Sequence, residues 1–186
     1  MEELEFYLEE AKDHMEKSLS HVSHALAKIR AGRAMPSMLD GLMVDYYGNP
    51  TPISQVASVN TPDAKTLAIK PWEKNMLAEI EKVIINSDLG LNPQNDGEII
   101  RLNIPPLTEE RRKDLVKQSR HEAEHGKVSV RNVRKDANDH LKKLLKEHIS
   151  EDEVKKAEAK VQDLTNEYVK KIDEILAKKE DEIMTV

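Results

Sequence analysis

The chain contains no cysteine, and only 3% of its 186 residues are aromatic. The absence of cysteine excludes a disulfide framework, a thiolate nucleophile and a cysteine-based zinc site. With so few aromatic rings, an aromatic-cored sandwich is disfavoured. Charged residues make up 34% of the chain, and its abundance of Ala, Glu, Lys and Leu favours long helices instead.

Long hydrophobic runs are missing as well, since no uninterrupted apolar run exceeds three residues. A membrane span needs about 20 such residues. The first residues, Met1 to Glu5, are acidic where a secretory or mitochondrial presequence would be basic. We therefore expect a soluble, cytoplasmic protein without a membrane partner.

The common enzyme signatures are also absent. The chain has no G-x-x-x-x-G-K-S/T or G-x-G-x-x-G loop for a nucleotide and no G-x-S-x-G elbow for a serine nucleophile. No catalytic residue and no cofactor are predicted.

Three segments repeat apolar residues at spacings of three and four, which places those residues on one face of a helix. The segments are Leu4–Ile29, Leu115–Leu144 and Val154–Ile175. Ser150 and Glu153 have the spacing of a capping box in front of the third segment. Rods this long can bury their apolar faces only against one another, so the pattern predicts a long three-helix bundle.

Between the first and second segments, proline and glycine become frequent and the helical spacing mostly disappears. Short β-type runs on either side of Gly48-Asn49-Pro50 indicate two strands around a turn, and two more runs follow. The predicted strands are residues 42–47, 53–59, 67–70 and 99–104. A short helix is expected between the last two of them.

The chain is therefore predicted to be an α+β protein of two domains. The bundle takes residues 1–31 and 105–186, and the small mixed α/β domain, residues 32–104, is inserted between its first two helices. Two connectors join the domains, and both contain residues with special backbone properties: glycine reaches conformations closed to other residues, and proline fixes φ. The expected hinge residues are Gly32, Pro36, Pro105 and Pro106.

One motif suggests a metal. His121-Glu122-Ala123-Glu124-His125 is an H-E-x-x-H on a predicted helix, the arrangement in which two histidines bind zinc and the glutamate acts as a base. The sequence offers no third ligand downstream, where the helix becomes basic. We therefore expect no metal, although a zinc metallopeptidase remains an alternative function.

Positive charge is confined to one stretch. Residues 105–150 carry 12 Lys and Arg against 8 Asp and Glu, whereas the whole chain has a net charge of −6. On the second predicted helix the cations recur at helical spacing beside the apolar face. Such a line suits a phosphate backbone, because each neutralised phosphate releases counterions. The cations of this line are Lys127, Arg131, Arg134 and Lys142, with Lys135 at its edge.

The same line could instead be an ordinary solvated face that pairs with acids of the third helix, such as Glu151, Glu153 or Asp163. The chain would then be a helical scaffold that binds no nucleic acid. Charge alone leaves both alternatives open.

Four blocks of the sequence resemble the bacterial ribosome recycling factors, in order and at the expected spacing. They are Lys28–Ala34 (KIRAGRA), Asp88–Pro93 (DLGLNP), Ile104–Lys113 (IPPLTEERRK) and Val130–Ala137 (VRNVRKDA). The resemblance covers essentially the whole chain, which makes it far more specific than any single motif.

This resemblance implies an L-shaped, two-domain, monomeric protein that is not an enzyme. With elongation factor G and GTP, it would split post-termination ribosomes so that the subunits can be used again. The bundle would bind large-subunit ribosomal RNA, and the α/β domain would face elongation factor G and swing. The residues expected to bind ribosomal RNA are Arg30, Arg33, Lys127, Arg131, Arg134 and Lys135.

Overall fold

The computed structural model describes residues 2–147 and 149–185, which form two compact units. The helical unit comprises the chain up to Ala31 and Glu109–Thr185, and the α/β unit comprises Gly32–Thr108. Residues 105–108, which we expected in the bundle, therefore group with the α/β unit. Met1 and Val186, the outer ends of the predicted bundle, lie outside the described residues.

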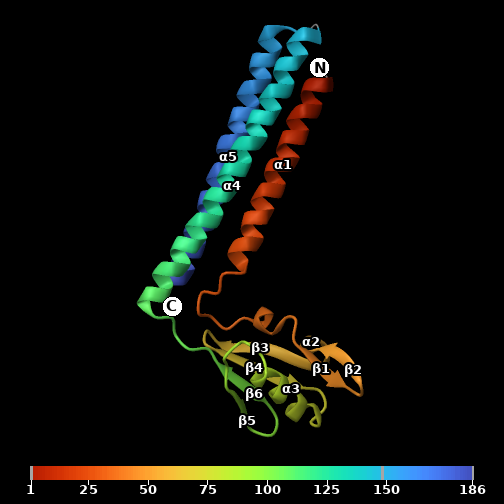
Figure 1. Ribbon diagram of the computed structural model, residues 1–186, viewed down its shortest axis with the longest axis vertical. Coiled ribbons are helices and arrows are strands. Elements are labelled where there is room, and N and C mark those ends of the chain that lie inside the picture. Colours follow the sequence, from red (N-terminus) through yellow and green to blue (C-terminus); the bar gives the residue numbers. More distant parts are fainter. Residues whose placement is uncertain (1, 148, 186) are drawn as a thin grey trace. The chain divides into compact units, whose positions relative to one another are not determined.

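The helical unit is a bundle of three long helices, as predicted. Figure 1 shows α1 (Glu2–Ala27), α4 (Glu109–Leu144) and α5 (Glu151–Met184) side by side, with α4 antiparallel to the other two. A short 3₁₀ turn, η2 (Leu145–Glu147), follows α4. At about 1.5 Å per residue, α4 and α5 are rods of roughly 50 Å.

The predicted apolar faces form the core of this unit, and small residues bring two helices close together. Ser119, Ala123 and Gly126 are buried on one face of α4. A Cβ atom added at Gly126 would collide with Cγ2 of Val22 on α1, which is itself buried. The glycine is therefore needed for the close approach of α1 and α4.

A buried tyrosine ties α5 to α1. The Tyr168 hydroxyl donates a hydrogen bond of 2.7 Å to Oε2 of Glu16, and only 1% of the residue is exposed. Burial, together with the bond to Glu16, raises the pKa of Tyr168 to about 12. The phenol therefore remains a neutral donor through the physiological range.

The capping box before α5 is confirmed. The Ser150 hydroxyl accepts a hydrogen bond of 3.3 Å from the Glu153 amide, and the Glu153 carboxylate accepts one of 3.4 Å from the Ser150 amide. Each side chain satisfies an amide that has no partner within the helix. This reciprocal pair explains why α5 begins at Glu151.

The α/β unit holds two antiparallel sheets and its own apolar core. The larger sheet has the strand order β3-β4-β6-β5, and the smaller one pairs β1 with β2. Ile69, Ile80 and Ile100 are among the fully buried residues of this core. The strands are β1 (Met43–Tyr46), β2 (Asn49–Pro52), β3 (Ala57–Asp63), β4 (Thr66–Pro71), β5 (Pro93–Asn95) and β6 (Ile100–Asn103). The helices are η1 (Pro36–Leu39), α2 (Ile53–Val56) and α3 (Met76–Ile85).

Three details of this unit differ from the sequence prediction. The strand that pairs with β1 is β2, and it already begins at Asn49, inside the predicted turn, because only Tyr47 and Gly48 separate the two strands. Residues 53–56 form the one-turn helix α2 and not the start of a strand, because Ile53 and Val56 are both buried at a spacing of three. The strand β5 was not predicted, since Pro93, Gln94 and Asn95 lie at a sheet edge with no alternating apolar pattern. Among the described residues, no helix is both long and apolar enough to cross a membrane.

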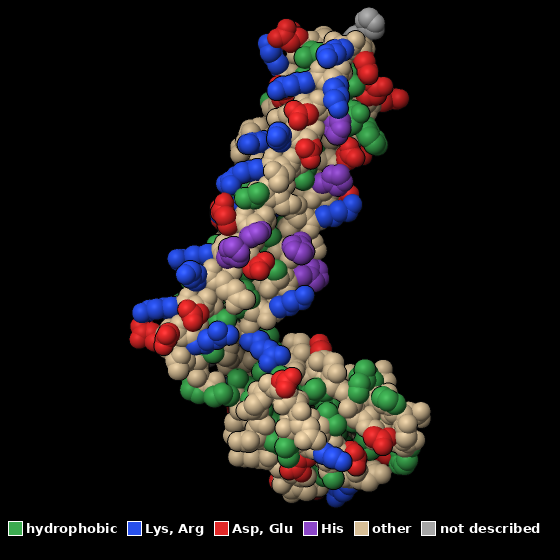
Figure 2. Space-filling model, viewed as in Figure 1, with side chains coloured by type: hydrophobic (Ala, Val, Ile, Leu, Met, Phe, Trp, Pro, Cys, Tyr) green, Lys and Arg blue, Asp and Glu red, His purple; other side chains and the backbone are tan. Residues whose placement is uncertain are grey.

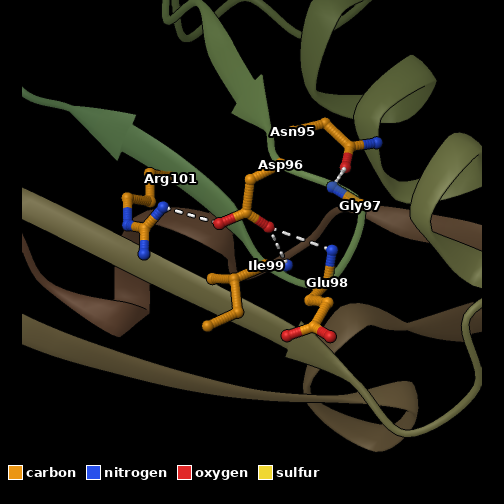
Figure 3. A network of polar contacts seen from close by, with 6 residues as sticks. All are labelled: Asn95, Asp96, Gly97, Glu98, Ile99 and Arg101. Atoms are coloured by element: carbon orange, nitrogen blue, oxygen red, sulfur yellow. Dashed lines mark hydrogen bonds and ion pairs between the residues drawn. The ribbon is translucent and has the colours of Figure 1, made fainter.

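The hairpin between β5 and β6 is closed by one carboxylate, Asp96, shown in Figure 3. Its Oδ1 accepts hydrogen bonds from the amides of Ile99 (2.8 Å) and Glu98 (3.0 Å), and its Oδ2 pairs with Nη1 of Arg101 at 2.7 Å. The two amides, more than Arg101, lower the pKa of Asp96 below its ordinary value of 3.8.

We expect Asp96→Ala to lower the melting temperature of the α/β unit at pH 7. Because the folded pKa is lowered, the stabilisation is fully present above pH 3.8 and is lost as the pH falls through the folded value. Thermal melts of the wild type and the variant should therefore converge in acid. Asp96→Asn, which keeps an oxygen acceptor without the charge, is the matched control. A difference in melting temperature that stays constant with pH would contradict this assignment.

Candidate nucleic-acid interface

The predicted line of cations runs along one side of α4, next to the buried Val130, Ala137 and Leu141. Figure 2 shows Lys and Arg side chains recurring along the helical unit, with carboxylates between them. We refer to five residues of α4 as the basic stripe. They are Lys127, Arg131, Arg134, Lys135 and Lys142.

The middle of the basic stripe keeps its positive charge accessible. The Arg131 side chain is 48% exposed, and its Nη1 lies 3.3 Å from Oε1 of Glu124. Such an exposed pair contributes little energy and is easily exchanged for another anion. Arg134 donates to a neutral group, Oε1 of Gln162, at 3.4 Å. Lys135 is exposed and has no ion pair across residues 2–147 and 149–185.

Lys127 differs from the rest of the stripe. Its ammonium forms an ion pair with Asp173 of α5, and its side chain is only 18% exposed. This pairing ties α4 to α5 and leaves Lys127 less available to an outside anion than Arg131.

Two of the three acids that we considered as partners of the stripe are engaged elsewhere. Glu151 pairs with Lys155 at 2.7 Å, and Glu153 caps α5. Within the described chain, neither these two nor Asp163 forms an ion pair with the stripe. The expected ion pairs between the stripe and these three acids are therefore wrong. Of the stripe residues, only Lys127 pairs with an acid of α5, and that acid is Asp173.

The stripe extends toward the start of α4, beyond the cations predicted from the sequence. Lys113, Lys117 and Arg120 share its side of the helix and line a groove of about 480 Å³, whose apolar part is Val116 and Met184. Arg120 pairs with Glu180 of α5 at 2.6 Å. Lys113, Lys117, Arg120 and Lys127 follow one another at helical spacings of four, three and seven residues, so the sequence does contain a signal for this extension. Glu124 obscures that signal, because it places a negative charge between Arg120 and Lys127 on the same side of the helix.

The remaining predicted cations flank the boundary between the two units. Arg30 belongs to the helical unit and Arg33 to the α/β unit, and both are exposed. Neither forms an ion pair within the described ranges. Both guanidinium groups are therefore open to solvent.

The H-E-x-x-H histidines do lie together. The rings of His121 and His125 are exposed and meet edge to face, with their centroids 4.5 Å apart. Across residues 2–147 and 149–185, however, no group of three or more His, Asp or Glu side chains is arranged to hold a metal. A structural or catalytic zinc site needs at least three protein ligands.

We therefore expect the purified chain to retain well under one zinc ion per molecule after dialysis, as measured by elemental analysis. Two imidazoles on one helical face can bind a divalent ion only in rapid exchange, because the remaining positions are left to water. His125→Ala should change the residual zinc very little. Stoichiometric zinc that is lost in this variant would contradict the expectation and restore the peptidase alternative.

The chain is similar to known proteins over its whole length. The family described as ribosome recycling factor matches residues 22–184. Ribosome-recycling factors of Cytophaga hutchinsonii and Christiangramia forsetii are 55% and 57% identical to it over 186 residues, all of this chain and all of theirs.

Two solved structures are similar as well. A solution structure of the ribosome recycling factor has a TM-score of 0.77 at 38% identity, with all of both chains covered. A model of the Thermus thermophilus factor, bound with Escherichia coli elongation factor G to the E. coli post-termination complex, has a TM-score of 0.63 at 52% identity, and 97% of this chain and 98% of that chain are covered. The four sequence blocks, the helical bundle and these full-length similarities agree, and the chain belongs to the ribosome recycling factor family.

Proposed function

We propose that the chain splits post-termination ribosomes together with elongation factor G, and so recycles the subunits for a new round of protein synthesis. The factor acts as a monomer in the cytoplasm and is not an enzyme, since GTP is hydrolysed by its partner. The support is membership of the family over the full length, and the relative that has been placed with elongation factor G on a post-termination complex.

The observation that carries this proposal is the accessible charge in the middle of the basic stripe. Arg131, Arg134 and Lys135 hold three positive charges on a rigid helix, and none of them is fixed in a buried ion pair. Guanidinium groups suit phosphate because they donate two parallel hydrogen bonds. In our proposal these residues make the main contacts to large-subunit ribosomal RNA, and Arg30, Arg33 and Lys127 add further contacts.

The two connectors meet at Gly32, which supports a hinge there. Gly32 has φ of +75°, and a Cβ at this position would lie 2.8 Å from Cγ of Leu107 on the returning connector. Pro36 opens η1, and the exposed Pro105 and Pro106 stiffen the other connector. In our proposal, rotation between the domains is concentrated at these residues and not spread into either core.

We expect Gly32→Ala to cost about 1–2 kcal/mol of stability, because alanine is strained at positive φ, and to slow ribosome splitting. Leu107→Ala in the same chain removes the steric overlap but not the backbone strain, so the double variant should recover only part of the loss. Thermal melts and splitting rates of the wild type, the single variant and the double variant test this. A Gly32→Ala variant with the melting temperature and splitting rate of the wild type would argue against a hinge at Gly32.

Light scattering of purified post-termination ribosomes tests the function directly. Splitting into subunits should require the chain, elongation factor G and GTP together, and leaving out any one of them should abolish the fall in scattering. Splitting that proceeds without the chain, or no splitting with all three present, would refute the proposal.

A further inference from the structure

The β1–β2 hairpin has an unusual residue at its turn. Tyr47 and Gly48 connect the strands, with φ of +50° and +84°. Two-residue turns with positive φ at both positions strongly favour Asn-Gly, because side chains larger than Asn are strained there. Among the described residues, Tyr47 is the only non-glycine residue with positive φ. The turn itself therefore gives no reason for a tyrosine.

Hydrogen bonds hold this tyrosine in an outward position. The Tyr47 hydroxyl donates to Oε2 of Glu73 at 2.9 Å, and the Tyr46 hydroxyl donates to Oε1 of the same carboxylate at 3.4 Å. Asn75 donates to the Tyr47 hydroxyl at 3.3 Å, and the two rings meet edge to face with centroids 4.7 Å apart. We refer to Tyr46, Tyr47, Glu73 and Asn75 as the Glu73 cluster.

The Tyr47 ring of the cluster is exposed to solvent and not buried. Tyr47 is 70% exposed, and Trp72, next to Glu73 in the chain, is 67% exposed. In Figure 2, hydrophobic side chains gather on the α/β unit where Figure 1 places β1 and β2. Tyr and Trp are enriched among the residues that carry most of the energy of protein interfaces.

The charge of the cluster is not neutralised. Glu73 forms no ion pair within residues 2–147 and 149–185, and its negative charge raises the pKa of the Tyr46 hydroxyl. A carboxylate beside open aromatic faces attracts a cation in two ways, by direct charge pairing and through the ring quadrupole.

We propose that the Glu73 cluster binds a lysine or arginine side chain of a protein partner. This rests on the proposed function, because the partner would be met on the ribosome. Ribosomal RNA is disfavoured as the occupant: residues 32–104 carry 9 Asp and Glu against 6 Lys and Arg, and the carboxylate of the cluster repels phosphate.

Tyr47→Asn separates a binding role from a structural one. Asparagine suits this turn better than tyrosine, so the variant should melt at or above the wild-type temperature. We nevertheless expect it to split ribosomes about tenfold more slowly, the effect of losing one cation–π contact. Glu73→Gln removes the charge but keeps an oxygen acceptor for one of the two tyrosines, and it should slow splitting by a similar factor. Ile85→Asn, at a 60% exposed residue elsewhere on the same unit, is the matched control and should be neutral.

A photo-crosslinker identifies the occupant. We would place a benzophenone amino acid at Trp72 and irradiate the full chain on purified post-termination ribosomes with elongation factor G. A crosslink to protein that is weakened by Glu73→Gln is the expected result. A crosslink to ribosomal RNA, no crosslink, or a Tyr47→Asn variant that splits at the wild-type rate would overturn the proposal. If the wild-type chain splits no ribosomes, the proposed function is refuted. The crosslink then still shows whether the Glu73 cluster contacts protein or RNA.

Discussion

Gly126→Ala is expected to destabilise the helical unit by about 2 kcal/mol. Two effects oppose each other at this position. Alanine is a better helix former than glycine by about 1 kcal/mol, but overpacking of a dense core costs up to about 3 kcal/mol. Overpacking should win, because the new Cβ collides with buried Val22, whose branched side chain has one strongly preferred rotamer in a helix.

Chemical denaturation followed by circular dichroism measures this change. The matched control is Val22→Ala, which removes the methyl group that the new Cβ would meet. The double variant should be destabilised by less than the sum of the two single variants, since each substitution makes room for the other. A Gly126→Ala chain as stable as the wild type would mean that helix propensity dominates and that the close approach of α1 and α4 is not required.

The second large effect concerns RNA. We expect Arg131→Ala combined with Arg134→Ala to weaken binding to the large ribosomal subunit by at least about 100-fold, since each charge-assisted hydrogen bond contributes roughly 1.5–3 kcal/mol. Helical content and melting temperature should stay nearly unchanged. Within the protein, the double substitution removes an exposed ion pair to Glu124 and a hydrogen bond to Gln162, both longer than 3.2 Å.

Lys127→Ala supplies the contrasting control for this pair. Because Lys127 is held by Asp173 and is mostly covered, its removal should cost more stability and less affinity than the loss of Arg131. Binding by filtration or sedimentation at a fixed salt concentration separates the two patterns. If Lys127→Ala is the more damaging change for affinity, the accessible part of the stripe has been assigned to the wrong residues.

Periodic features of the sequence were sufficient to predict the helical unit. Three long apolar stripes and a capping box depend on spacing alone, so α5 and its start at Glu151 could be predicted. Short elements of the α/β unit could not, because their residues follow tertiary packing. Ile53 and Val56 form a helical turn since both reach the core, and β5 exists only because β6 lies beside it.

The candidate interface shows the same division. The line of cations on α4 follows from spacing, but its pairing with α5 does not. Nothing in the sequence distinguishes Lys127, which is tied to Asp173, from Arg131, which is open to solvent. The Glu73 cluster could not be predicted from the sequence either, because Tyr47 and Glu73 are far apart in the chain and only the fold of the α/β unit brings them together.

The salt dependence of binding tests most directly whether the basic stripe binds RNA phosphates. The logarithm of the binding constant for the large subunit should fall linearly with the logarithm of the salt concentration, and each phosphate contact contributes about 0.7–0.9 to the slope. The slope for the variant lacking Arg131 and Arg134 should therefore be smaller in magnitude than that of the wild type by about 1.4–1.8. Equal slopes for the two proteins would show that these arginines neutralise no phosphate, and would restore the solvated-face interpretation of α4.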